Sequence, residues 1–277
     1  MKTSMGLFSR KAAGETAPAG GGTSRLIGRP SLHEDVQAGA EYQRDLMPRT
    51  PPALPGYDLA FTFKPARAMS GDFFDFLALD ARRTAIVVAD ASGKGIPASL
   101  LAVMAQLCFR ARPDPGASAA RTLAAVNAML HGNLKRGTFL TGIYAVLDAG
   151  RHELSMANAG HLPAVVWHSR QRIATAHRSN GPVLGVLAPA PFEASVNEET
   201  VPLAPGDRFV FFTDGMNEAM APGQKEFGME HLRKRLMAQS DGPSADFLRD
   251  LTSQLDLHAA GGEQSDDITI VTGRRLP

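Results

Sequence analysis

The sequence contains one cysteine, Cys108, and no long apolar run. A single cysteine excludes an internal disulfide framework and a zinc site built from cysteines. No apolar run approaches the ~20 residues that a membrane span needs, and the basic N-terminus lacks the apolar core of a secretory signal. We therefore expect a cytoplasmic protein with no membrane partner. Cys108 lies in the apolar stretch 98–109, which predicts a buried, unreactive thiol.

Signals for nucleic acid and for common nucleotide-binding loops are also missing. The formal net charge is +1, without the basic excess of a nucleic-acid-binding surface. Neither a G-x-G-x-x-G nor a Walker A sequence occurs, and the cysteine lacks the Cys-x₅-Arg context of a thiol phosphatase. The remaining composition, 44% hydrophobic and 21% charged, is typical of a globular protein.

The N-terminal region divides into a tail and a helix. Residues 1–30 are rich in Gly, Ala, Ser and Thr, which predicts disorder. Ser31 and Glu34 have the spacing of a capping box and predict a helix from Ser31 to Met47, followed by a Pro-rich connector up to residue 56. The apolar stripe of this helix must be covered either by its own domain or by a second subunit or partner, and both alternatives remain open.

From residue 57 onward the pattern is rich in strands. The predicted strands are 57–64, 73–79, 84–90, 139–147, 153–157, 163–168, 208–213 and 268–272, and the predicted helices are 96–112, 117–134, 229–238 and 245–257. Blocks of strands and helices with short links indicate an α+β fold with antiparallel sheets. A helix pair between two strand groups predicts two sheets stacked face to face, with helices outside.

Acidic residues mark the ends of several predicted strands. Apolar runs lead into Asp90 and Asp214, Asp72 opens another strand, and the pair Asp266-Asp267 precedes the last one. Carboxylates that face a common point repel each other unless a cation neutralises them. Because oxygen ligands of this kind suit Mg²⁺ or Mn²⁺, convergence of these residues would create a site for a hard divalent cation.

Single motifs also permit other interpretations. The loop from Asp90 to Gly95 joins a strand to a helix and could cradle a phosphate, although a leading carboxylate is the better metal ligand. Asp214-Gly215 alone fits a hairpin turn. His161, in a turn expected to shape the edge of the site, is interpreted as structural.

Together the motifs resemble the PPM-type (PP2C-like) serine/threonine phosphatases, in the bacterial branch of SpoIIE and RsbU. The resemblance rests on residues 65–75, 88–98, 158–161, 181–186, 206–207, 213–219, 227–228 and 266–269. It implies that residues 57–277 form a phosphatase domain with an α/β/β/α sandwich of two antiparallel sheets. One departure is Ser70-Gly71-Asp72, where the family usually has Gly-Gly-Asp, so a side chain is added beside the site.

The resemblance also implies a centre of two Mn²⁺ or Mg²⁺ ions. Its ligands would be Asp72, Asp90, the carbonyl of Ala91, Asp214 and one of Asp266 and Asp267. Asp90 would bridge the ions, and Asp72 would serve one of them. Asp214 would serve the other ion with Asp266, which the family pattern favours over Asp267. The implied reaction is hydrolysis of phosphoserine or phosphothreonine by water that the two ions activate, with Asp90 and Asp214 essential for catalysis.

The implied substrate is a phosphorylated regulatory protein of the anti-sigma-factor antagonist type. The helix from Ser31 to Met47 resembles the linker that couples such domains to a sensor, so a homodimer or a sensor partner is expected there. Two alternatives remain: a catalytically silent phosphoprotein-binding module of the same fold, and another two-metal phosphoesterase.

Overall fold

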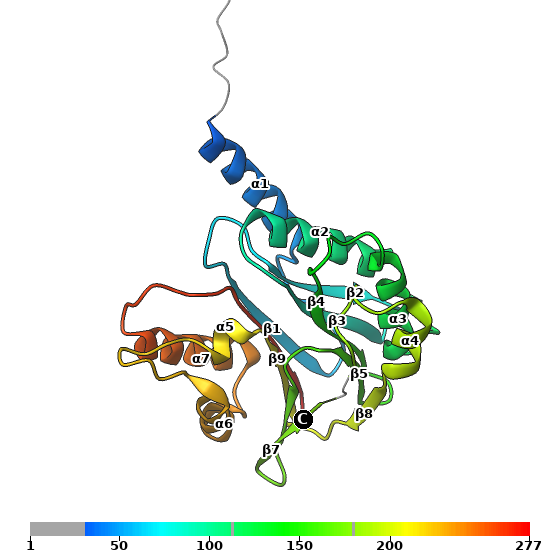
Figure 1. Ribbon diagram of the computed structural model, residues 1–277. Helices are drawn as coiled ribbons and strands as arrows, with labels where there is room; N and C mark the ends of the chain where they lie inside the picture. Colours follow the sequence, from blue (N-terminus) through cyan, green and yellow to red (C-terminus); the bar gives the residue numbers. More distant parts are fainter. Residues whose placement is uncertain (1–30, 112–113, 179–180) are drawn as a thin grey trace, which may run out of the picture.

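Two antiparallel sheets form the centre of the protein. The computed structural model describes residues 31–111, 114–178 and 181–277 (Figure 1). The first sheet has the order β2 (Asp72–Ala78), β3 (Arg83–Ala91), β4 (Leu140–Asp148), β5 (Glu153–Ala159) and β8 (Glu198–Pro202). The second has the order β1 (Tyr57–Lys64), β10 (Ile268–Arg275), β9 (Arg208–Phe212), β6 (Ala164–His168) and β7 (Ile173–His177).

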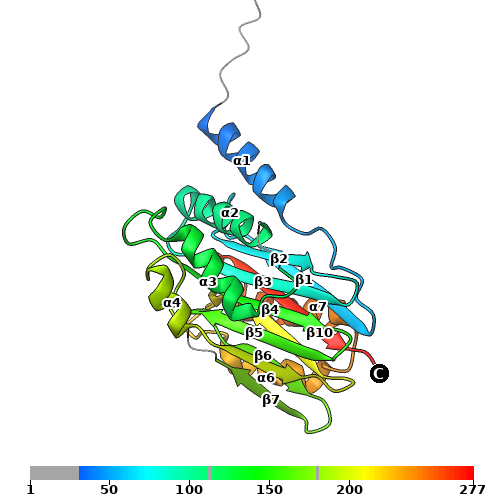
Figure 2. The same cartoon turned by 90° about the vertical axis from the view of Figure 1, so that its right-hand side faces the viewer.

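Helices cover the outer face of each sheet. On the first sheet, α2 (Ile96–Arg110) contacts β2 and β3, α3 (Ala119–Leu130) contacts β4 and β5, and the short α4 (Pro189–Ser195) packs on α3. On the second sheet, α7 (Ser244–Ala259) contacts β1 and β10, and α6 (Gly228–Gln239) contacts β7. The α/β/β/α order of layers, seen in Figures 1 and 2, confirms the predicted sandwich.

Burial on both faces explains the continuous apolar runs of the central strands. Residues 84–89 of β3 are all buried, because one face meets the helices and the other meets the second sheet. Between the sheets, Phe61 of β1 lies against Phe74 of β2, with ring centroids 4.4 Å apart. Cys108 is buried on α2, as predicted, and burial raises the pKa of its thiol.

Helix α1 (Leu32–Leu46) begins with the predicted capping box. Ser31 Oγ accepts from Glu34 N at 3.2 Å, and the Glu34 carboxylate accepts from Ser31 N at 2.5 Å. At the other end, the carbonyl of Leu46 accepts from Gln106 at 3.1 Å and from Arg110 at 2.5 Å. Both donors belong to α2, so the C-terminal end of α1 is fixed to the domain.

The N-terminal half of α1 projects away from the domain (Figure 1). Ala40, Gln43 and Met47 are buried, whereas Leu32 and Tyr42 are 77% and 79% exposed. The domain itself therefore covers only part of the apolar stripe. The predicted disorder of residues 1–30 concerns a segment outside the described residues.

Three short elements between β6 and β9 are absent from the prediction: β7, α4 and β8. Conversely, Asp214-Gly215 does not form a hairpin turn, since it opens the single helical turn α5 (Asp214–Asn217). Within the described part of the chain, no helix combines the length and apolar character that crossing a membrane would require.

Candidate metal centre

The pairing of β2 with β3 places Asp72 opposite Asp90. Side chains directly opposite each other in an antiparallel pair have Cβ atoms about 4.5–5.5 Å apart, and like charges there are unfavourable. Burial and then the charge of Asp90 raise the pKa of Asp72 well above its usual range, although hydrogen bonds from Thr213 and Thr269 act in the opposite direction. The first sheet thus contributes two closely placed carboxyl groups.

The second sheet brings the other acidic residues to the same end of the sandwich. Thr213 N donates to the carbonyl of Thr269 at 3.0 Å, which continues the β9–β10 ladder as far as Thr213, the residue before Asp214. Next to it, a Cβ added to Gly215 would lie 2.0 Å from the carbonyl oxygen of Asp267, so only glycine fits this approach. Asp214 is therefore held beside the segment that precedes β10.

Two threonine hydroxyls join the sheets at this point. Thr213 Oγ1 donates to Asp72 Oδ2 at 2.6 Å, and Thr269 Oγ1 donates to the same oxygen at 2.7 Å. Asp72 belongs to the first sheet and both donors to the second, so these bonds fix the relative position of the two strand pairs. Sequence reasoning missed this role, although each threonine lies within an acidic motif.

The two adjacent aspartates before β10 have different surroundings. Asp267 Oδ1 accepts from Ala66 N at 2.7 Å, and Asp267 Oδ2 accepts from Gly71 N at 2.8 Å. Both of its oxygens are thus engaged by the loop before β2. Asp266 instead lines the cavity described below and forms an ion pair with Lys94.

Ser70, where the sequence departs from the family pattern, is buried and hydrogen-bonded. Its hydroxyl accepts from Asp72 N at 3.0 Å and donates to the carbonyl of Asp72 at 3.2 Å. Ser70 is not among the residues with positive φ. The additional side chain is therefore accommodated, and it anchors the backbone of Asp72.

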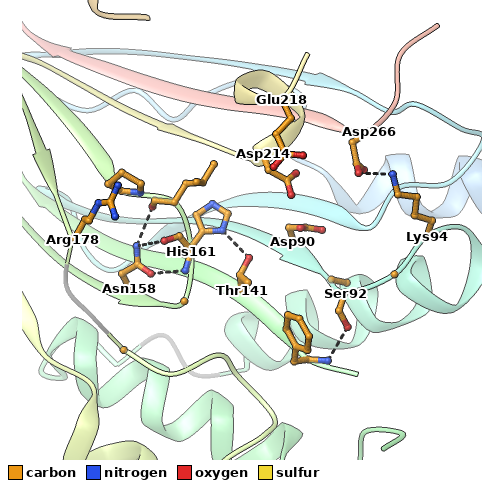
Figure 3. Close-up of a pocket in the computed structure, with 17 residues that line it drawn as sticks. Asp90, Ser92, Lys94, Thr141, Asn158, His161, Arg178, Asp214, Glu218 and Asp266 are labelled. Atoms are coloured by element: carbon orange, nitrogen blue, oxygen red, sulfur yellow. Dashed lines mark hydrogen bonds and ion pairs between the residues drawn. The ribbon is translucent and has the colours of Figure 1, made fainter. Parts of the chain in front are cut away.

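A cavity of about 680 Å³ opens where these elements meet (Figure 3). Its acidic lining comprises Asp90, Asp214, Glu218 and Asp266, and Ala91 also lines it. In Figure 3, Lys94 and Arg178 lie on opposite sides of this acidic group. Asp72 and Asp267 do not line the cavity.

Crowding of carboxylates perturbs their protonation. Burial, followed by the charges of Asp214, Asp266 and Asp267, raises the pKa of Asp90 to about 7. Burial and then Asp266 raise the pKa of Asp214. An excess of buried negative charge with oxygen donors alone suits a hard divalent cation.

The side chains at this site are thus of the kind that binds a divalent cation, but they are not arranged around an ion. Among the described residues, no three His, Cys, Asp or Glu side chains form a group already arranged to hold an ion. Hydroxyls of Thr213 and Thr269 engage one oxygen of Asp72, and Lys94 engages one oxygen of Asp266. Ligation would require local side-chain movement.

The segment from Asn158 to His161 borders the cavity. The amide of Asn158 donates to the carbonyls of His161 and Leu162, both at 3.0 Å, and fixes the local backbone. His161 Nδ1 lies 2.9 Å from Thr141 Oγ1, and burial lowers the pKa of His161 to about 4. His161 is therefore neutral at pH 7.

The family model for Stage II sporulation protein E (SpoIIE) matches residues 80–276. The chain belongs to the SpoIIE family. The match includes Asp90, Asp214 and Asp266 and begins after Asp72. It confirms the PPM-type, SpoIIE/RsbU-branch resemblance that the motifs indicated.

Relatives and solved structures agree with this assignment. Phosphoserine phosphatase RsbU of Bacillus subtilis (strain 168) is 27% identical over 187 residues, covering 68% of this chain and 54% of RsbU. The SiaA-PP2C domain of Pseudomonas aeruginosa has a similar fold, with a TM-score of 0.77, 21% identity, and coverage of 88% of this chain and 96% of that domain. RsbX in complex with magnesium has a TM-score of 0.58 at 16% identity, covering 79% of this chain and 94% of RsbX. The chain spans about half the length of the curated relatives it matches.

Proposed function

We propose that this chain is a metal-dependent protein serine/threonine phosphatase that hydrolyses phosphoserine or phosphothreonine on a regulatory protein. The observation that carries the proposal is the meeting of Asp90, Asp214 and Asp266, from both sheets, around one cavity. Membership of the SpoIIE family and similarity to a phosphoserine phosphatase support it. A substrate of the anti-sigma-factor antagonist type belongs to the same proposal.

The proposed centre holds two divalent ions, Mn²⁺ or Mg²⁺. Asp90, whose charge interacts with those of the other aspartates of the site, would bridge them, and the carbonyl of Ala91 would be a further ligand. Asp214 and Asp266 would hold one ion, and Asp72 would contribute to the other. Once bound, the ions would supply the Lewis acidity that activates water and offsets phosphoryl charge. The magnesium complex of RsbX is a precedent for a cation in a related fold.

Asp266 is proposed as the ligand in preference to Asp267. Both carboxylate oxygens of Asp267 accept backbone N–H groups, so Asp267 holds the loop that leads to Asp72. Among the described residues, no backbone N–H of the loop before β2 donates to Asp266, and Asp266 lines the cavity. In this assignment one aspartate of the pair positions the site, and the other binds the ion.

We also propose that α1 transmits a signal to the site from a second copy or from a sensor partner. Gln43 Nε2 donates to the carbonyl of Ser70 at 2.6 Å, and Ser70 N donates to Gln43 Oε1 at 2.9 Å. The same Ser70 hydrogen-bonds the backbone of Asp72. A partner that binds the exposed half of α1 could therefore move Asp72 through two residues.

Cation-dependent phosphate release tests the proposed activity. The full chain is assayed with an aryl phosphate monoester, a phosphoserine peptide and an aryl phosphate diester, with Mn²⁺ or with chelator. We expect hydrolysis of both monoesters with Mn²⁺ only, and a loss of about 100-fold or more in Asp90→Asn and Asp214→Asn, the size seen when a group that stabilises transition-state charge is removed.

Asp256→Asn serves as the control, because Asp256 is an exposed aspartate outside the cavity. An inactive wild type, or full activity in both variants of the cavity residues, would contradict the proposed activity. Faster cleavage of the diester than of the monoesters would favour another two-metal phosphoesterase.

A further inference from the structure

Lys94 lies in the loop between β3 and α2, at the edge of the acidic cavity. The residues on either side, Gly93 and Gly95, have φ values of +95° and +72°. Side chains other than glycine are strained in this region, so the two glycines define the path of the loop. In Figure 3 the Lys94 side chain extends from this loop towards Asp266.

Two acceptors hold the ammonium group. Lys94 Nζ lies 2.7 Å from Asp266 Oδ2 and donates to the carbonyl of Ser265 at 3.0 Å. The side chains of Lys94 and Asp266 are 50% and 35% exposed. A lysine ammonium group is positively charged at neutral pH. The ion pair thus occupies one carboxylate oxygen of Asp266, a residue that lines the acidic cavity.

We propose that Lys94 is a built-in competitor of the divalent cation for Asp266. This inference rests on the proposed function, because it takes Asp266 as a metal ligand. Mg²⁺ binds oxygen ligands at about 2.0–2.1 Å, which would place a bound ion within a few ångströms of an ammonium group on the same carboxylate. Repulsion between the two cations disfavours simultaneous binding, so a cation that binds Asp266 does so at the expense of the contact between Asp266 and Lys94.

The ion pair between Lys94 and Asp266 affects the affinity for the cation more than the stability of the fold. An ion pair between half-exposed side chains contributes little to the stability of the fold. The same pair is nevertheless weakened each time a cation binds Asp266, and the ammonium group remains near by. Lys94 therefore weakens cation binding and raises the cation concentration at which the site fills.

A matched pair elsewhere on the protein provides the control. Lys64 Nζ lies 2.9 Å from Asp256 Oδ1, with side chains 53% and 67% exposed, and neither residue lines the acidic cavity. Lys64→Met removes the same charge and the same kind of ion pair as Lys94→Met. Lys94→Arg keeps the charge beside Asp266.

The experiment is a calorimetric titration of the full chain, first stripped with chelator, with Mn²⁺. We expect Lys94→Met to bind Mn²⁺ about 1.4- to 5-fold more tightly than the wild type, the range given by an exposed ion pair. Lys94→Arg and Lys64→Met should keep the wild-type Kd. Thermal unfolding checks that each variant is folded, and Mn²⁺ should raise the Tm of Lys94→Met more than that of the wild type.

Each outcome decides one claim. Equal or weaker Mn²⁺ binding by a folded Lys94→Met overturns the competition, while binding by the wild type leaves the proposed metal centre standing. An equal gain in Lys64→Met would assign the effect to net charge and also overturn it. If the wild type binds no Mn²⁺, the proposed function fails and the inference fails with it.

Discussion

Asp90 should destabilise the chelated protein at neutral and alkaline pH, and Asp90→Asn should relieve this effect. Burial and the neighbouring aspartates raise the pKa of Asp90 from an ordinary value of 3.8 to about 7. Between these two values the folded state retains a proton that the unfolded state releases. The free energy of unfolding therefore falls as pH rises from about 4 to about 7, and it stays low above that range.

The size of the effect follows from the two pKa values. Their difference, at 1.36 kcal/mol per pKa unit, corresponds to about 4 kcal/mol at pH 8. About 2–3 kcal/mol of this develops between pH 5 and pH 8. For a protein of this size, 1 kcal/mol corresponds to about 2–4 °C in Tm. Asn cannot ionise, so Asp90→Asn should unfold at a Tm on the order of 10 °C higher than the wild type at pH 8, with a smaller gain at pH 5.

Circular dichroism melts with chelator, at pH 5 and pH 8, measure this directly. Asp256→Asn is the control, since Asp256 is exposed and pairs with Lys64 outside the cavity; it should change the Tm little at either pH. A Tm of Asp90→Asn equal to or below that of the wild type at pH 8 would refute the electrostatic reasoning. So would a gain that does not depend on pH.

Three further substitutions test how the site is held. Gly215→Ala places a Cβ 2.0 Å from the carbonyl of Asp267, and should lower the free energy of unfolding in urea by about 1–3 kcal/mol; an unchanged value would show that the two segments can separate without cost. Ser70→Gly removes two hydrogen bonds to the backbone of Asp72, and should cost about 1–2 kcal/mol in the same assay. Gln43→Ala leaves the buried N–H and carbonyl of Ser70 without these partners, and should cost about 1–3 kcal/mol and alter the Mn²⁺ dependence of phosphate release. Wild-type stability and Mn²⁺ dependence in Gln43→Ala would rule out coupling through α1.

Strands with strong apolar runs could be predicted from the sequence. The prediction for β1, residues 57–64, has the bounds that the structure gives, and β3 and β9 differ by one residue at their ends. The missed elements carry weak signals. α4 has seven residues and includes Pro189 and Pro191, and β8 is an edge strand with Glu198 at one end and Pro202 at the other. Neither helical periodicity nor apolar alternation stands out in such short segments.

The candidate site was predictable where it depends on the ends of strands. Asp90 and Asp214 follow apolar runs, so the fold brings them to one end of the sandwich. The link from Thr213 to Asp72 and the ion pair of Lys94 with Asp266 depend on side-chain directions across segments more than 100 residues apart, since their sequence separations are 141 and 172. Local patterns carry no information about such contacts.

Equilibrium dialysis with Mn²⁺ tests the central claim, that aspartates from both sheets form one two-ion centre with Asp90 between the ions. The account predicts two ions bound per wild-type chain and loss of this binding in Asp90→Asn, with Asp256→Asn still binding two. Two ions bound to Asp90→Asn with the wild-type Kd would contradict it.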